Sequence, residues 1–407
     1  DNYKFYPKIL LHKVNSIFDS QNEIKVFVNQ ANINKIENNR EEILEFLKNT
    51  KIKNDSTKFK HLFPFVEANA KIQLKNNTIK SNIRLKGDRM IHFEDQNNSS
   101  YRLKIRDNET YNDMTKFSLQ KPRIRNYLHE WIFHELLGVG GLVKINYDFY
   151  DFYLNNDYKG YYVLEESFDN NLLIRNNRPV GPIFSTFEEF NRTNLNSKKM
   201  FEVYDKKSWT NNESKLLITK ETLEKIDSYL KGNLNFNDVF DIKKWAWFFA
   251  VTDLTYTYHG TMLKSVKFYY NPSTSKIEPI GYDGHRTLPN FSKYNEVSKF
   301  NKTNFTLAKE NLEKKLYDRI FPIIQTGFFF NNEDLNYDFY EEYIKAIYNI
   351  SSEEFLNKFF EDRKKKIKNI NSGIYSDDYE FDKNSLIKSG IGIYYYDKED
   401  IYRRADN

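Results

Sequence analysis

The spacing of hydrophobic and polar positions changes along the chain, and the first third has the two-residue period of β-strands. Short alternating runs occur as VEANAKIQL at 66–74, TIKSNIRLKG at 78–87 and SSYRLKI at 99–105. They predict an antiparallel sheet with tight turns. Two more strands are expected in 145–154 and 159–167, on either side of an Asn-Asn-Asp turn.

The pattern becomes mostly helical later in the chain. A helix is expected after the sheet, at 126–137, with Asn126 as its N-cap and Gly138 as its end. Apolar residues at helical spacing predict further helices, and one hairpin interrupts them, in VKFYYNPSTSKIEPI. These helices are expected at about 220–231, 240–252, 334–348 and 352–370, the last with a capping box of Ser351 and Glu354.

This order of elements predicts the α+β class, with a sheet-rich first lobe and a helical second lobe. Upstream of the sheet, IKVFVN at 24–29 predicts a short strand and 37–49 predicts a charged helix. We expect an N-terminal extension over residues 1–60 and a C-terminal tail over residues 376–407. Between them we expect the two lobes, at 61–168 and 169–375.

Composition and charge narrow the possible functions. Hydrophobic residues make up 39% of the chain, which is enough for a sizeable core. The 62 basic and 57 acidic residues nearly cancel, and a formal charge of +5 is too small to indicate a nucleic-acid partner. No cysteine is present, which excludes disulfides, zinc-thiolate sites and thiol nucleophiles. The apolar run at 320–330 is too short for a membrane span and contains Pro322.

Two isolated acids are the main candidates for chemistry. Asp283 lies in GYDGHR, directly after the expected hairpin and next to glycines that allow a phosphate to approach the backbone. Asp253 ends the very apolar segment WAWFFAVTD. One acid as base and one as metal ligand is the arrangement of a kinase active site.

The strand SSYRLKI offers cations for a phosphate. Alternation places Arg102 and Lys104 on the face opposite to Tyr101. Either cation could reach nucleotide phosphates, with Glu130 on the following helix as its carboxylate partner. The alternative is a solvent-facing sheet surface on which these charges have no function.

Several blocks of the sequence, in order from about residue 60 to residue 290, resemble the CotH kinase family, whose members are related to the spore coat protein H and are similar to atypical protein kinases. The blocks are RLKGD, SSYRLKI, KFSLQKPRIRNYLHEW, GYYVLEES, LLIRNNRPVGPIF, TDLTYTYHG and KFYYNPSTSKIEPIGYDG.

The resemblance implies a bilobal protein-kinase-like fold and transfer of the γ-phosphate of ATP to Ser or Thr of a protein substrate, with Mg²⁺ or Mn²⁺. Asp253 would be the catalytic base and Asp283 the metal ligand. The backbone around Leu164, Glu165 and Glu166 would meet adenine. Other residues implied at the nucleotide are Arg84, Arg102, Lys104, Arg125, Asn126 and Glu130.

The chain departs from the family pattern at three places. Asn98 stands where a lysine is expected, so Arg102 or Lys104 would supply the phosphate-binding cation. Ser265 stands where relatives carry an asparagine that is a metal ligand, and its hydroxyl could ligate magnesium. Gly284 and His285 follow Asp283 where some members have a second acid. His259 could orient Asp253 or a phosphate, or could be an ordinary hydrogen-bonded histidine.

Two other functions remain open from the sequence. A kinase-like fold can also transfer AMP or ligate glutamate, if the nucleotide binds in the inverted orientation. Asn98 and Ser265 are compatible with a catalytically weak pseudokinase or a binding module.

Overall fold

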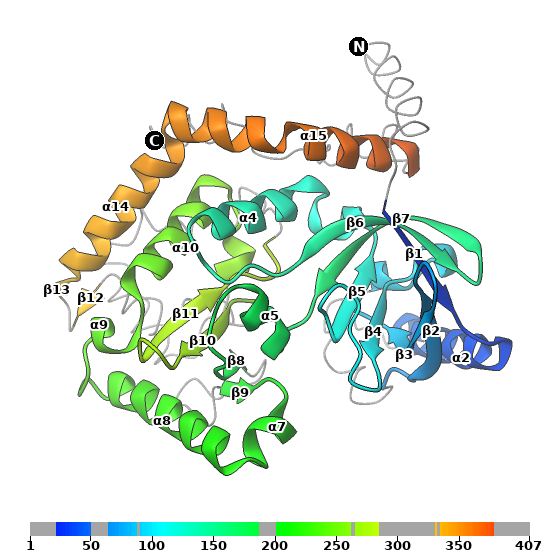
Figure 1. The fold of residues 1–407 in the computed structure, drawn as a ribbon, viewed down its shortest axis with the longest axis horizontal. Helices are drawn as coiled ribbons and strands as arrows, with labels where there is room; N and C mark the ends of the chain where they lie inside the picture. Colours follow the sequence, from blue (N-terminus) through cyan, green and yellow to red (C-terminus); the bar gives the residue numbers. More distant parts are fainter. Residues whose placement is uncertain are drawn as a thin grey trace. The chain divides into compact units, whose positions relative to one another are not determined.

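The computed structural model describes residues 22–49, 64–87, 90–186, 201–261, 265–284, 330–331 and 334–377 (Figure 1). The predicted roles of His285 and of the tail after residue 377 lie outside the described residues, as does most of the apolar run 320–330. Of the described helices, none is long and apolar enough to cross a membrane.

The chain divides into two compact units, each of which we describe by itself. The first contains Asp1–Leu128, Asn146–Ser167 and Arg363–Tyr394, and the second contains His129–Ile145, Phe168–Asp362 and Tyr395–Asn407. The predicted extension over residues 1–60 contributes a strand and a helix to the first unit. The predicted lobe boundaries and the kinase-like arrangement of two lobes stay predictions.

The first unit is built around a closed barrel of seven strands, in the order β1-β2-β3-β4-β5-β7-β6. Alternation creates its core, because side chains such as Ile72, Ile83, Leu103 and Phe117 point inward and are at most 1% exposed. The strands are β1 (Glu23–Phe27), β2 (Ala68–Gln73), β3 (Thr78–Leu85), β4 (Tyr101–Ile105), β5 (Lys116–Gln120), β6 (Tyr147–Leu154) and β7 (Asp157–Glu166).

Closure of the barrel is a finding that the sequence pattern does not predict. Strand β1 pairs in parallel with β6, where Val26 lies opposite Leu154, and antiparallel with β2. The side chain of Asn155 fixes this junction, since it accepts a hydrogen bond from Val28 N and donates one to Val28 O, both at 2.8 Å. A pairing of strands so far apart in the chain leaves no local signal, so the sequence predicts only an open sheet.

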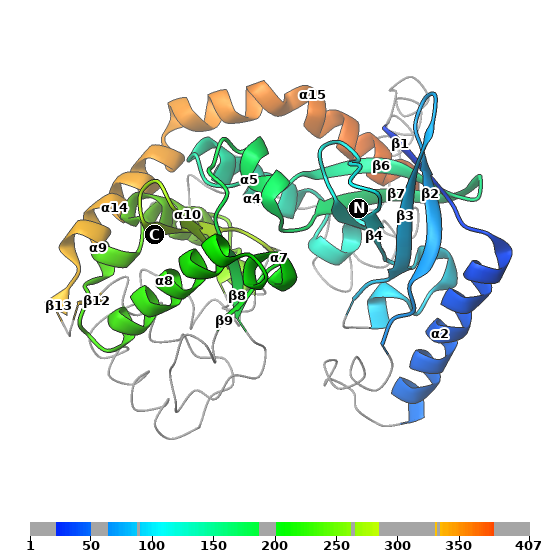
Figure 2. The same cartoon turned by 60° about the horizontal axis from the view of Figure 1, so that its bottom comes forward.

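Among the described residues, a long helix and three 3₁₀ turns accompany the strands of the first unit. Helix α2 (Gln30–Asn49) lies along β2 and β3 and buries Ile36 and Ile43 (Figure 2). The 3₁₀ turns are η2 (Met90–His92), η3 (Gln96–Asn98) and η4 (Pro122–Arg125).

The second unit contains a four-stranded sheet, order β11-β10-β8-β9, and most of the helices. The predicted hairpin is confirmed as β10 (Lys267–Asn271) and β11 (Lys276–Ile280). Strands β8 (Ile183–Thr186) and β9 (Phe201–Val203) are too short to show a period, and the sequence does not predict them. The α+β class is therefore confirmed, although the second unit is not purely helical.

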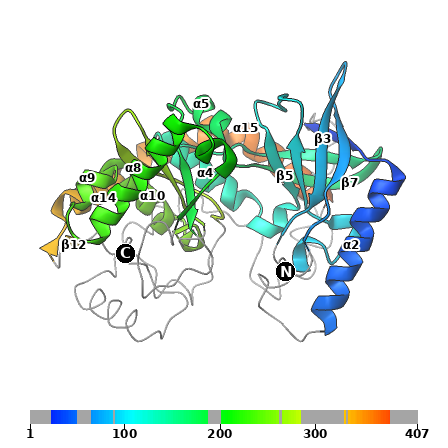
Figure 3. The same ribbon diagram turned by 90° about the horizontal axis from the view of Figure 1, so that it is seen from below.

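The principal helices of the second unit cover regions where the sequence predicts helices. Helix α10 buries Trp245, Phe248 and Phe249, and α14 lies beside it (Figure 3). The helices are α4 (Leu128–Val139), α5 (Asn170–Arg175), α7 (Lys206–Thr210), α8 (Glu213–Leu230), α9 (Phe236–Val239), α10 (Ile242–Leu254), η5 (Tyr258–Thr261), α14 (Tyr337–Ser351) and α15 (Glu353–Asp377), with a two-residue hairpin of β12 (Phe330–Asn331) and β13 (Asp334–Leu335). The last part of α15 belongs to the first unit.

Two predicted caps are wrong. Asn126 is not the N-cap of α4; with a φ of 55° it is the left-handed C-cap of η4, a turn that Pro122 starts. The cap before α15 is not Ser351, which ends α14, because the Ser352 hydroxyl accepts the hydrogen bond from Phe355 N at 3.3 Å. Gly138 lies inside α4, which continues to Val139.

Candidate active site

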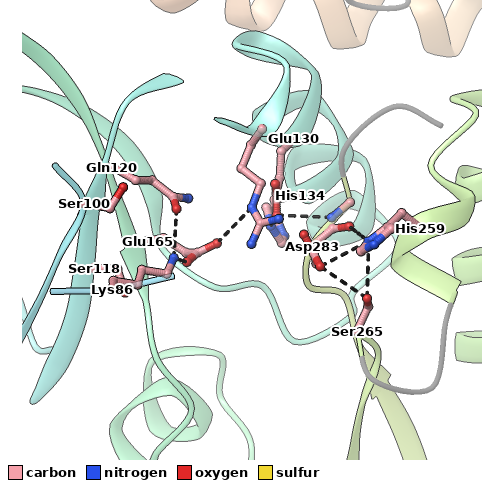
Figure 4. Close-up of polar contacts among 12 residues, drawn as sticks. Lys86, Ser100, Ser118, Gln120, Glu130, His134, Glu165, His259, Ser265 and Asp283 are labelled. Carbon is pink, nitrogen blue, oxygen red and sulfur yellow. Dashed lines mark hydrogen bonds and ion pairs between the residues drawn. The ribbon is translucent and has the colours of Figure 1, made fainter. Parts of the chain in front are cut away.

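A buried ion pair on the outer wall of the barrel is the first of two candidate groups, which belong to different units of the chain. Lys86 follows the end of β3, and its Nζ contacts Glu165 Oε2 on β7 and donates a hydrogen bond of 2.9 Å to Gln120 Oε1 on β5 (Figure 4). The two charged side chains are 8% and 1% exposed. Arg125 Nε lies 3.8 Å from the other oxygen of Glu165.

The charges of this group shift one another's titration. Burial acts to raise the pKa of Glu165, but Lys86 and Arg125 outweigh it and lower that pKa to about 2. Burial lowers the pKa of Lys86 to about 8, and Arg125 and Arg102 add to this although Glu165 opposes it. At neutral pH Glu165 is an anion held by a cationic Lys86.

Gln120 adds a donor to this group. Lys86 Nζ can only donate, so the oxygen of the carboxamide must face it and the amide nitrogen must point elsewhere. That nitrogen, Gln120 Nε2, is buried and has no hydrogen-bond partner among the described residues. A buried donor without a partner costs about 1–3 kcal/mol. Gln120 Nε2 is thus placed to bond an oxygen of a ligand.

The Glu165→Gln change should make the free energy of unfolding depend less steeply on pH below about 4.5. Glu165 has a lower pKa in the folded state than its ordinary 4.5, so its stabilisation is fully present above that pH and is lost as pH falls toward 2. We expect the free energy of unfolding of wild type to fall over this range more steeply than that of Glu165→Gln, as measured by urea titration at each pH. The exposed Glu42→Gln is the control, and parallel profiles for all three proteins would contradict the assignment.

The second group surrounds Asp283, which follows β11. The Asp283 backbone has a φ of 59°, a left-handed conformation that is uncommon outside glycine, asparagine and aspartate. His259 Nδ1, on η5, lies 3.1 Å from Asp283 Oδ2 and 3.2 Å from the Asp283 carbonyl oxygen. The Ser265 hydroxyl lies 3.5 Å from the same carboxylate oxygen (Figure 4). The predicted residues Asp283, His259 and Ser265 therefore do come together.

This arrangement does not fit a serine hydrolase. In a Ser-His-Asp triad, serine and aspartate use opposite nitrogens of the imidazole. Here the Ser265 hydroxyl, at 3.4 Å, and the Asp283 carboxylate both approach Nδ1 of His259. One nitrogen cannot relay a proton between them, so metal or phosphate binding is the more consistent chemistry.

Helix α4 holds the segment that carries Asp283. The carboxylate of Glu130 accepts a hydrogen bond of 3.2 Å from Gly284 N, and it is fully buried. A side chain at Gly284 or Gly281 would come within 2.3 Å of Phe133 or Leu137 respectively. These glycines let the segment lie directly against the helix, which fixes the position of Asp283.

Asp253 lies near the end of α10. Its Oδ2 accepts a hydrogen bond of 2.6 Å from the hydroxyl of Tyr343 on α14, and both side chains are buried.

The other predicted residues have different environments. Arg84 and Arg102 are partly buried on the outer wall of the barrel, and Lys104 is exposed there. Leu164 points into the barrel core, and Glu166 N donates to Asn146 O at 2.9 Å. Asn98 lies in η3 and donates to Asp95.

Lys86 and Gln120 are the residues that the sequence analysis misses. Lys86 stands in the quoted motif RLKGD, and alternation along β3 already places it on the same outward face as Arg84. Its partner cannot be read from the chain, since Glu165 is distant in sequence and the predicted role of Glu165 concerns the backbone. Among the described residues, no three His, Asp or Glu side chains converge into a group that could hold a metal.

Comparisons with known proteins add little. No protein-family model and no curated protein matches the sequence. Among solved structures, the Helicobacter pylori proinflammatory kinase CtkA is similar, with 13% identity and a TM-score of 0.27, over 75% of this chain and 88% of that chain. At this TM-score the similarity supports no conclusion about fold or function.

Proposed function

We propose that this protein is an ATP-dependent protein kinase that transfers the γ-phosphate to Ser or Thr of a protein substrate, and that its two units are the lobes of a kinase-like fold. The observation that carries the proposal is the buried Lys86–Glu165 pair. In protein kinases a strand lysine held by a glutamate binds the nucleotide phosphates.

The first group would bind the phosphates. Glu165 positions the ammonium group of Lys86, so the lysine can donate to a phosphate oxygen without reorganising. Gln120 Nε2 supplies a second donor beside it. Arg125, which lies beside Glu165 and acts to lower the pKa of Lys86, adds positive charge. Lys86 thus takes the role that the resemblance assigns to Arg102 or Lys104.

The second group suits Mg²⁺ or Mn²⁺. Magnesium is usually bound in proteins by one or two carboxylates together with substrate phosphates and water. Asp283 would provide the carboxylate and Ser265 an additional oxygen, while His259 orients the carboxylate through Nδ1. When bound, the metal neutralises charge on the β- and γ-phosphates.

Asp253 would be the general base. It accepts the proton of the substrate hydroxyl as the oxygen of that hydroxyl bonds to the γ-phosphorus, and the bond from this phosphorus to the β,γ-bridging oxygen breaks to release ADP. Tyr343 is a positioning residue, because its hydroxyl donates a hydrogen bond to Oδ2 of Asp253 and so fixes the orientation of the carboxylate.

The Asp253→Asn change should slow phosphate transfer roughly 10²–10⁴-fold, because the amide keeps the hydrogen bond with Tyr343 but cannot accept a proton. Tyr343→Phe should slow transfer less and shift its pH profile. The measurement is the rate of γ-labelled phosphate transfer from ATP to a protein acceptor. Tyr348→Phe, an exposed change on the same helix, is the control. Folded variants of Asp253 and Tyr343 with wild-type rates would remove both residues from the mechanism.

A nucleotide-binding protein with weak or no transfer is the second candidate. Ser265 in place of an asparagine motivates it, since a neutral hydroxyl is a weaker metal ligand than a carboxylate or a carbonyl oxygen. ATP binding to wild type without any labelled product would favour this candidate.

A further inference from the structure

Four cations gather on the outer wall of the barrel, beyond Lys86. Arg84 on β3 lies directly opposite Arg102 on β4, and Lys104 on β4 lies directly opposite Lys116 on β5. The intervening residues Ile83, Leu103 and Phe117 fill the barrel interior, so the four cations share the outer face. We refer to Arg84, Arg102, Lys104 and Lys116 as the cationic strip.

The cationic strip has little compensating negative charge. Like charges directly opposite each other on neighbouring strands are destabilising. Glu67 lies 3.9 Å from Arg84, and Arg102 Nε donates to the neutral Ser118 hydroxyl at 3.2 Å. Among the described residues, no carboxylate oxygen lies within 4.0 Å of the ammonium nitrogen of Lys104 or of Lys116. Two pairs of like charges with so little compensation repel each other, and an anionic ligand would relieve this repulsion.

Titration of the strip agrees with this geometry. The pKa of Lys116 is lowered to about 8, mainly by burial and also by Arg102, Arg84 and Lys104, while Glu67 acts in the opposite direction. Burial, with Arg102, also lowers the pKa of Arg84 to about 10. An anion bound to the strip would reverse the repulsion, so its binding should be coupled to proton uptake by Lys116.

We propose that the cationic strip binds an acidic segment of a polypeptide. Under the proposed function, on which this identification of the partner rests, the segment belongs to the protein substrate. The nucleotide has its own cation, Lys86, whose partners are Glu165 and Gln120. Arg84 is the next outward-facing residue on the same strand, so the strip begins beside the proposed phosphate-binding group.

The size and composition of the strip favour a peptide over a nucleic acid. It covers three adjacent strands, about 10 Å across at a spacing of roughly 4.8 Å, and only about 7 Å along each strand. A few carboxylates can occupy that area, whereas a protein on duplex DNA commonly makes about 6–10 phosphate contacts. The outward positions near it on these strands are Asn82, Lys86, Ser118 and Gln120, none of which is aromatic. Among the described residues, the one ring found against the strip is that of Phe65, whose centroid lies 5.6 Å from the guanidinium carbon of Arg84.

Binding of a fluorescein-labelled peptide of alternating Glu and Gly to the full chain tests the proposal, with fluorescence anisotropy as the readout. We expect saturable binding at low salt that weakens about tenfold in the double variant Lys104→Glu/Lys116→Glu. The exposed double change Lys35→Glu/Lys48→Glu, on α2, alters the net charge by the same amount and is the control. The affinity of wild type should also fall as pH rises through about 8, where Lys116 loses its charge.

Three results would overturn the proposal. Equal weakening by Lys35→Glu/Lys48→Glu would show an effect of net charge alone. If a single-stranded oligonucleotide binds the same residues more tightly than the peptide does, the ligand of the strip is a nucleic acid and not a polypeptide. An equal loss of ATP affinity in the double variant would make the strip part of the nucleotide site. Peptide binding can be measured without phosphate transfer, so the two proposals fail separately. Phosphate transfer without peptide binding would refute only the role of the cationic strip. Peptide binding without phosphate transfer would refute only the proposed kinase activity.

Discussion

Lys86→Met should strongly weaken ATP binding and slow phosphate transfer. The ammonium group of Lys86 is the buried cation of the first group, and methionine keeps most of its length and apolar volume without the charge. Losing the phosphate contact should reduce transfer by about 10² or more, since a charge-assisted hydrogen bond in a preorganised site is worth several kcal/mol. The measurement is ATP affinity by calorimetry, followed by the rate of γ-phosphate transfer.

The control for Lys86→Met must separate lost chemistry from lost folding. Removing one partner of a buried ion pair leaves the other charge uncompensated, at a cost of about 3–5 kcal/mol. The double variant Lys86→Met/Glu165→Gln removes both charges and should recover much of the stability while remaining inactive. Lys80→Met, which removes a cation from an exposed ion pair on the same strand, should retain activity. Wild-type transfer by a folded Lys86→Met protein would contradict the role of this residue.

Asp283→Asn should abolish metal-dependent transfer while the fold survives. Asparagine tolerates the left-handed backbone at position 283, where alanine would add strain, so the substitution isolates the charge. We expect roughly a thousandfold loss of rate, because the metal contributes several kcal/mol of charge stabilisation in the transition state. The measurement is the transfer rate over a range of Mg²⁺ and Mn²⁺ concentrations.

A matched control exists for Asp283→Asn. Asp205 precedes α7 and has a φ of 50°, so Asp205→Asn makes the same chemical change at a similar backbone conformation. This control should leave the transfer rate and its metal dependence unchanged. Undiminished transfer in Asp283→Asn at low metal concentration would show that another residue holds the metal.

The sequence predicts what depends on local period and on position relative to a strand. Alternation places Leu103 inside the barrel and Arg102 outside, as the structure has them. The hairpin before Asp283 is similarly local, because its two strands are joined by a short turn. The sequence predicts these features because each depends only on residues that are close together in the chain.

The remaining features depend on contacts between distant parts of the chain. The closed barrel needs Val26 beside Leu154, and the buried pair needs Lys86 beside Glu165. No period in the sequence encodes such contacts. Asn126 shows a local failure: its residue type fits an N-cap, but the turn started by Pro122 makes it a C-cap.

The central claim is transfer of the γ-phosphate, and intact mass spectrometry of an acceptor protein tests it most directly. Wild type and Asp283→Asn would each be incubated with the acceptor, ATP and Mg²⁺ or Mn²⁺, and the mass of the protein itself would be followed in the same samples. The account predicts a phosphate-sized gain with wild type and none with Asp283→Asn. A gain the size of AMP or of glutamate, or no gain with wild type under any metal, would contradict it.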